Sequence, residues 1–312
     1  MQRHASHRPS RRAVLQGIAA GLAGLALGGR SAAQGSTLER TEVAAGITLL
    51  SGAGANILVL ATDDGKVVVD SGAAASRDAV LAALEDGPGG RVSALFNTHW
   101  HPEQVGGNAA LGAAGATIFA HEKTRIRLRT GYYLPTEDRY EPPMPDAGLP
   151  SETVYTDGAT TVGGRRIDYG YLIEAHTDGD IFVSFPDANV IAVGDVLSPG
   201  IDPVFDWFGG GWLGGRVDAL ARLLDMSDGE TRFVPSQGRI LGRADVQAEH
   251  DYMLRFFELM VEHVRLGESA EDILALGVLD GLGRTFQDPG KLLYDVHKGF
   301  WAHHNKLNHD IV

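Results

Sequence analysis

Between residues 41 and 276, short apolar runs alternate with amphipathic stretches. Apolar runs bounded by turn residues predict strands, and apolar positions at helical spacing predict helices. Strands are expected at residues 41–51, 56–62, 66–70, 92–96, 116–120, 160–163, 165–171, 181–185, 190–195 and 231–238. Helices are expected at residues 76–84, 108–114, 217–226, 245–266 and 271–276. This alternation of strands and helices predicts an α/β fold.

Local features refine this pattern. The turn Asp63-Asp64-Gly65 predicts that the strands on either side of it pair as a hairpin, and Ser76 is a candidate helix cap. Residues 130–150 hold five prolines and no periodicity, which predicts a long loop that could border a binding groove.

The first 33 residues carry the pattern of an export signal. Residues 1–12 contain four arginines and no acid, residues 13–27 are apolar, and Ser31-Ala32-Ala33 offers small residues for cleavage. The segment 10–15 (SRRAVL) resembles a bacterial twin-arginine signal, which implies a periplasmic or secreted protein. An ordinary signal peptide or an uncleaved anchor is the alternative. Residues 34–312 are then expected to form a single domain.

Charge and cysteine content narrow the function. The chain of 312 residues has net charge −13, and removal of residues 1–33 takes away five arginines and no acid, which leaves −18. Such a charge repels phosphate backbones, so no nucleic-acid partner is expected, and no membrane partner after signal cleavage. The chain has no cysteine, which excludes disulfides and thiolate ligands. A metal site must therefore use His, Asp, Glu or amide oxygen.

The most informative stretch is residues 97–108, NTHWHPEQVGGN. His99 and His101 follow the expected strand at 92–96, and in extended backbone residues two apart point to the same side. Pro102 stops regular pairing and suits the first turn of a helix. Two imidazoles at the mouth of a strand can converge on one metal ion.

Two later motifs strengthen this interpretation. His176 opens the sequence H-T-D-G-D, and Asp195 ends a run V-G-D about twenty residues later. With H-W-H-P and V-G-G-N, their order and spacing resemble the metallo-β-lactamase superfamily over roughly residues 40–250. The resemblance implies a four-layer αββα sandwich, here with a C-terminal helical extension.

The resemblance also assigns ligands, with departures. It implies that His99, His101 and His176 bind one metal and that Asp195 bridges to a second. Glu103 replaces the family's aspartate, Gln104 its next histidine, and Gln237 the histidine of a P-G-H-G motif.

Beneath the site, the resemblance places Asp70 of the sequence D-S-G as an outer carboxylate. A turn or cap role is the alternative for this residue.

Three histidines with one open position form a catalytic zinc site whose water has a pKa of about 7. Asp195 and Glu103 are the candidate catalytic carboxylates, and one zinc is expected. The second set, Glu103, Gln104, Asp195 and Gln237, offers only oxygen, which suits Mg²⁺, Mn²⁺ or Ca²⁺ better than zinc.

Three functions remain open at this stage. The first is a single-zinc hydrolase acting on a small molecule with an ester, lactam or lactone carbonyl. The second is a mixed site with a hard cation at Glu103 and Asp195, and the third is a non-catalytic binding protein with the same fold. A thioester substrate is a further alternative, which export disfavours because such thiols are cytosolic. The sequence does not indicate the oligomeric state.

The remaining histidines are expected to pack or to face solvent. His121 is interpreted as a packed or capping residue, and His297, His303, His304 and His309 in the tail are interpreted as solvated or packed. The apolar residues of the glycine-rich segment 198–215 could form a substrate wall or pack in the core.

Overall fold

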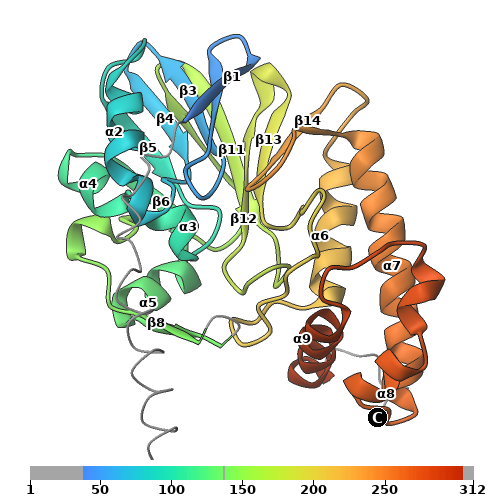
Figure 1. Cartoon of the computed structure of the whole chain (residues 1–312). Helices are drawn as coiled ribbons and strands as arrows, with labels where there is room; N and C mark the ends of the chain where they lie inside the picture. Colours follow the sequence, from blue (N-terminus) through green and yellow to red (C-terminus); the bar gives the residue numbers. More distant parts are fainter. Residues whose placement is uncertain (1–37, 136–137, 305–312) are drawn as a thin grey trace, which may run out of the picture. The chain divides into compact units, whose positions relative to one another are not determined.

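The computed structural model describes residues 38–135 and 138–304, in which two mixed β-sheets carry helices on their outer faces (Figure 1). The first sheet has seven strands in the order β1-β2-β3-β4-β5-β6-β9. These strands are β1 Glu39–Ala44, β2 Ile47–Ser51, β3 Ile57–Thr62, β4 Gly65–Val69, β5 Val92–Phe96, β6 Thr117–His121 and β9 Glu152–Val154.

The second sheet has six strands in the order β10-β11-β12-β13-β14-β15. They are β10 Gly158–Val162, β11 Arg165–Tyr171, β12 Ile181–Phe185, β13 Val190–Gly194, β14 Arg232–Pro235 and β15 Leu241–Gly242. A separate ribbon pairs β7 Tyr132–Leu134 with β8 Arg139–Glu141.

The α-helices of the described chain are α2 Arg77–Glu85, α3 Pro102–Val105, α4 Asn108–Ala113, α5 Glu122–Thr130, α6 Leu213–Asp225, α7 Arg243–Arg265, α8 Ala270–Ala275 and α9 Pro289–Ala302. Helices α2 and α4 lie on one side of the two sheets, and α6 and α7 lie on the other (Figure 1).

Alternation along the strands produces the layers. In β3, Leu58 and Leu60 pack against residues of the second sheet such as Ile181 and Val183, whereas Val59 packs towards the helical side of its own sheet. Successive side chains of a strand point to opposite faces, so each sheet buries both of its faces. The second sheet packs its outer face against α6, α7 and α9. The four-layer αββα prediction is therefore confirmed.

Parallel neighbours bring the ends of four strands to one edge. Strands β4 and β5 pair in parallel with Val69 opposite Phe96, and β13 and β14 pair in parallel with Gly194 opposite Pro235. The two sheets are tied there by the Ile181 N–H, which donates to the Thr98 carbonyl oxygen at 2.8 Å. Segments that leave the strands at this edge carry the motif residues.

Three sequence predictions need correction. The single strand expected at residues 41–51 is a hairpin, because the chain turns at Gly46 with φ of 77°. The loop expected at residues 130–150 contains the β7–β8 ribbon. Helix α6 begins at Leu213, four residues before the expected start, because its first turn contains the poor helix formers Gly214 and Gly215, which pack closely on Trp212 and Glu174 and hide the start in the sequence.

The hairpin of β3 and β4 and the helix after Pro102 are as expected. Ser76 is the N-cap residue of α2, but its side chain makes no capping hydrogen bond. The predicted signal segment 1–33 lies outside the described residues. No helix within residues 38–135 and 138–304 has the length and apolar character needed to cross a membrane.

Candidate metal centre

Four motif side chains meet at the shared strand edge. His99 lies three residues beyond β5, His101 occupies the N-cap position of α3, His176 lies in the loop between β11 and β12, and Asp195 directly follows β13. One potential ligand atom from each of the four lies within 4.8 Å of all the others. Residues far apart in the sequence thus form one group of metal-binding type.

The three imidazoles face one another edge-on. Their ring centroids are 4.8 to 4.9 Å apart, and the ring planes cross at 75° to 87°. His176 Nε2 lies 3.1 Å from His101 Nδ1, and Asp195 Oδ2 lies 3.3 Å from His99 Nε2 and 3.8 Å from His176 Nε2. Lone pairs so arranged repel each other unless a proton or a cation lies between them.

The outward nitrogen of each ring has its own acceptor. His101 Nε2 lies 3.1 Å from Asp206 Oδ2, and His176 Nδ1 lies 2.9 Å from the Val204 carbonyl oxygen. His99 Nδ1 lies 3.2 Å from the Thr98 hydroxyl.

The Thr98 hydroxyl itself donates to the carboxylate of Asp70 at 2.8 Å, so the His99 ring is the donor in its contact with Thr98. These bonds place each ring proton on the outer nitrogen and leave the inner nitrogen free as an acceptor, as in metal-binding histidines.

Charges in the group also suit a cation. Burial and the neighbouring His99 hold the pKa of His176 well below its ordinary value, so this ring is neutral. Burial alone would raise the pKa of Asp195, but the polar contact of its carboxylate with His99 and the other nearby histidines bring it below its usual range. Neutral imidazole and ionised carboxylate are the forms that bind metals.

A second carboxylate fixes the loop of His176. Asp180 accepts hydrogen bonds from the His176 and Thr177 backbone N–H groups at 2.6 and 2.8 Å and from the Thr177 hydroxyl at 2.7 Å. Burial raises the pKa of Asp180 to about 6, although these hydrogen bonds oppose the shift. The aspartate of H-T-D-G-D thereby orients the backbone that carries the ligand.

The residues expected at the second site are only partly brought together. Gln104 is buried, and its amide nitrogen lies 3.4 Å from Asp195 Oδ2 and 3.2 Å from the Ser236 hydroxyl. Glu103 instead lies 3.6 Å from the guanidinium of Arg139, and Gln237 is exposed. Neither of these two belongs to the four-residue group, and their proposed roles as ligands stay predictions.

Several residues in or near the centre were not predicted from the sequence. Asp206 and Val204 come from the glycine-rich segment, and Arg216 from the first turn of α6. Asp70 was expected beneath the site, and it acts through Thr98 instead of touching a histidine. The sequence did contain an indication for Thr98, because this residue directly precedes the first histidine of the motif.

Residues outside the group pack as expected. His121 Nδ1 accepts a hydrogen bond from the Lys123 backbone N–H at 3.2 Å, and its ring stacks on Tyr171 at 4.0 Å. His303 stacks on Trp212. The interpretation of His121 as a capping, packed residue is confirmed, and His309 lies outside the described residues.

The glycine-rich segment 198–215 contributes to the core, whereas its role as a substrate wall stays a prediction. Phe205 and Trp212 are core residues, whereas Phe208 is exposed.

A four-layer αββα sandwich with three histidines and a carboxylate at its strand edge is the architecture of metal-dependent hydrolases. The sequence model of the metallo-beta-lactamase superfamily matches residues 51–237, and the chain belongs to this superfamily. The predictions of the family and of an enzyme of the metallo-hydrolase class are confirmed at this level.

Known proteins agree with the assignment. A hydroxyacylglutathione hydrolase from Gloeobacter violaceus is 28% identical over 167 residues, which are 53% of this chain and 51% of that protein. The chain thus matches about half the length of this relative.

A metallo-beta-lactamase from Pontibacter korlensis superposes with a TM-score of 0.56 and 19% identity, covering 70% of this chain and 99% of that one. One from Erythrobacter litoralis gives 0.54 and 18%, covering 69% and 95%. These structures share the fold.

Proposed function

We propose that this protein is a zinc-dependent hydrolase that adds water to an ester, lactam or lactone carbonyl of a small molecule. The observation that carries the proposal is the convergence of three acceptor nitrogens, from His99, His101 and His176, beside the carboxylate of Asp195. Each ring proton is held on the opposite side by its own acceptor, so the site is arranged before any metal arrives.

The donor set fits zinc. His99 Nε2 is fully buried and has no hydrogen-bond partner among the described residues, and a buried polar atom without a partner costs free energy. Three imidazole nitrogens with a free position are the ligands of catalytic zinc. When bound, zinc would polarise the carbonyl and lower the pKa of a water molecule.

Asp195 is the group that can interact with the proton of the attacking water. Its carboxylate is ionised and lies beside all three histidines, so it can accept a hydrogen bond from the attacking water and orient it. The amide of Gln104 donates to Asp195 Oδ2 and keeps that oxygen in position. Glu103 is turned towards Arg139, which leaves Asp195 as the stronger candidate for this role.

A mixed-metal site is the second candidate, and one observation favours it. The side-chain oxygen of Gln104 is buried without a hydrogen-bond partner in the described part of the chain, and the nitrogen of the same amide faces Asp195. An amide oxygen and a carboxylate suit a hard cation such as Mg²⁺ or Mn²⁺. Binding of such an ion in addition to zinc would support this candidate.

Substrate and location are part of the same proposal. The name of the Gloeobacter violaceus relative adds a thioester to the substrates to be tested. The arginine-rich and apolar sequence of residues 1–33 supports action in the periplasm or outside the cell.

The test compares metal content and hydrolysis in untagged protein. The proteins compared are wild type, His101→Ala and the control His304→Ala, whose histidine is exposed two residues beyond α9. They are analysed for metals and assayed with a β-lactam, a lactone, an aryl ester and a thioester. We expect about one zinc per chain in wild type and in the control, and loss of zinc and activity in His101→Ala. Activity that survives in His101→Ala would overturn the mechanism, and a wild type without metal would favour a binding protein.

A further inference from the structure

Arg216 is a fully enclosed arginine beside the metal centre. It lies in the first turn of α6, and its side chain is completely buried. The acceptors of its guanidinium in the described chain are backbone carbonyls and a hydroxyl, with no carboxylate among them. Burial of a charge is costly, and a cation in the first turn of a helix meets the positive end of the helix dipole. The hydrogen bonds of this guanidinium must therefore offset an unfavourable position.

Those hydrogen bonds join two segments of the metal centre. Nε donates to the Val196 carbonyl oxygen at 2.8 Å, and Nη2 donates to the Asp195 carbonyl oxygen and, at 3.1 Å, to the Ser198 hydroxyl. Nη1 donates to the Val204 carbonyl oxygen at 3.1 Å. Arg216 thus connects the loop that begins at Asp195 with the backbone at Val204.

The Val204 carbonyl connects Arg216 to a second histidine-bearing segment. The same oxygen lies 2.9 Å from Nδ1 of His176. A carbonyl oxygen has two lone pairs, so it can accept from the imidazole and from the guanidinium together. One side chain therefore contacts the backbone of Asp195 and the acceptor that orients the His176 ring. Outer partners of this kind fix the orientation of metal-binding histidines.

Close packing fixes Arg216 itself. An added Cβ at Gly215 would lie 2.2 Å from the Glu174 carbonyl oxygen, so the first turn of α6 lies directly against the loop that carries His176. The guanidinium carbon lies 5.0 Å from the centre of the buried Phe205 ring. Helix and ring together leave the guanidinium little freedom to move.

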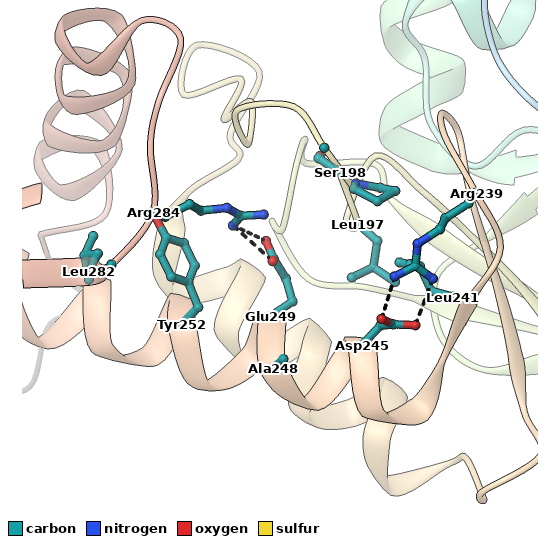
Figure 2. Close-up of a pocket in the computed structure, with 13 residues that line it drawn as sticks. Leu197, Ser198, Arg239, Leu241, Asp245, Ala248, Glu249, Tyr252, Leu282 and Arg284 are labelled. Carbon is teal, nitrogen blue, oxygen red and sulfur yellow. Dashed lines mark hydrogen bonds and ion pairs between the residues drawn. The ribbon is translucent and has the colours of Figure 1, made fainter. Parts of the chain in front are cut away.

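The loop after Asp195 is less firmly packed on its other side. Residues 197–200 line a pocket of about 560 Å³ that α7 and residues 282–284 complete (Figure 2). Because open space adjoins the loop there, packing alone does not fix its position. The hydrogen bonds from Arg216 to Asp195 and Ser198 hold the loop from the inside of the molecule.

We propose that Arg216 is a positioning residue, which sets the place of the Asp195 segment relative to the His176 ring. It acts through the Asp195 backbone and through the Val204 carbonyl. A guanidinium offers five N–H donors in fixed directions, whereas the single nitrogen of a lysine cannot reach acceptors spread in this way. Arg216→Lys therefore keeps the charge and loses the connection.

The inference rests on the metal site of the proposed function, so the first experiment measures metal binding. Competition with a chromophoric chelator gives the affinity for Zn²⁺, which should be about 10- to 100-fold lower in Arg216→Lys than in wild type, as for other outer partners of metal ligands. The visible absorption of bound Co²⁺ depends on the number and arrangement of its ligands, and it should change as well. Urea unfolding of the metal-free proteins gives their stability separately.

Arg243→Lys is the matched control. Arg243 donates to the backbone carbonyls of Leu224 and Ser227 and to the Ser227 hydroxyl, so it makes the same kinds of hydrogen bond at the other end of α6. This substitution should leave the Zn²⁺ affinity and the Co²⁺ spectrum unchanged, whatever it does to stability. Unchanged affinity in Arg216→Lys, or an equal loss in the two variants, would overturn the inference.

A measurement on metal-free protein separates this inference from the hydrolase proposal. Selective ¹⁵N labelling of histidine reports which ring nitrogen carries the proton, and the His176 signal is identified by its loss in His176→Ala. We expect the proton on Nδ1 in wild type and a larger share of Nε2-protonated ring in Arg216→Lys, because the Val204 carbonyl is no longer held.

If wild type binds no metal while Arg216→Lys alone shows this change, the hydrolase proposal fails and the positioning role stands. A His176 signal that is the same in wild type and in Arg216→Lys would remove the positioning role, whether or not metal binds. Wild type supplies the test if Arg216→Lys does not fold. The Nε–H signal of Arg216 should then shift when Zn²⁺ is added, whereas that of Arg243 should not, and an Arg216 signal that Zn²⁺ leaves unchanged would overturn the inference.

Discussion

The carboxylate of Asp206 lies 3.1 Å from Nε2 of His101, although 105 residues separate them. Its other oxygen accepts a hydrogen bond from the Gly209 backbone N–H at 2.8 Å, so the carboxylate is held on both sides. Burial alone would lower the pKa of His101, but Asp206 and the nearby carboxylates raise it. Asp206 therefore fixes the ring proton on Nε2 and turns Nδ1 towards the metal centre.

Asp206→Asn should lower metal affinity by about 10- to 100-fold, because the amide keeps the shape of the side chain but loses the charge that holds the ring proton. Competition with a chromophoric chelator measures the affinity. Asp187→Asn, an exposed turn carboxylate, is the control and should leave it unchanged. Equal affinity in the two variants would show that Asp206 does not position His101.

Metal removal should destabilise the protein by a predictable amount. Because the metal binds the folded chain, saturation at 100 times the dissociation constant stabilises by about 2.7 kcal/mol. We expect a chelator to lower the thermal midpoint of wild type and to have little effect on His176→Ala. A midpoint that is insensitive to chelator in wild type would mean that the four residues hold no stabilising ion.

The parts of the centre that the sequence predicted are those fixed by local geometry. His99 and His101 share a side because they follow a strand at a spacing of two, and Asp195 lies directly at a strand end. Asp206 could not be foreseen, because hydrogen bonds between its own backbone and distant loops, such as that from its N–H to the His176 carbonyl, set its place.

The sequence could not predict the direction of the Glu103 side chain for a related reason. It adjoins His101 in the chain, but its carboxylate is drawn to Arg139 of β8, in a stretch where no periodicity predicted a strand. The longer strands of the sheets could be predicted from the sequence, whereas the short strands β9 and β15 were not predicted. The turn at Gly46 was missed because apolar residues flank it closely.

The stability of the protein should fall in acid through His121. Burial and Lys123 lower the pKa of this imidazole from 6.5 to about 4, and its Nδ1 accepts a hydrogen bond that only the neutral ring can accept. The unfolded chain binds a proton below about pH 6.5 and the folded chain does not, so stability is lost as pH falls from 6.5 to 4.

Between pH 7 and pH 5 this loss should reach up to about 2 kcal/mol. Urea unfolding at both pH values, with chelator present throughout, measures it in wild type and in His121→Gln, which cannot take up the proton. A difference between the two pH values that is the same in both proteins would remove His121 as the cause.

Two glycines with positive φ allow the cost of backbone strain to be measured apart from a displacement of the metal centre. Gly194 has φ of 59°, and an added Cβ would lie 2.9 Å from Thr98, the residue that bonds His99. Gly164 has φ of 73°, and an added Cβ there meets nothing within 4 Å.

Alanine at either position should cost about 1 to 2 kcal/mol of backbone strain. Only Gly194→Ala should also weaken metal binding, because Thr98 must shift and carry His99 with it. Urea unfolding of the metal-free proteins gives the strain, and chelator competition gives the affinity. If Gly194→Ala bound metal as tightly as Gly164→Ala, the close packing of β13 on Thr98 would have no part in holding the histidine.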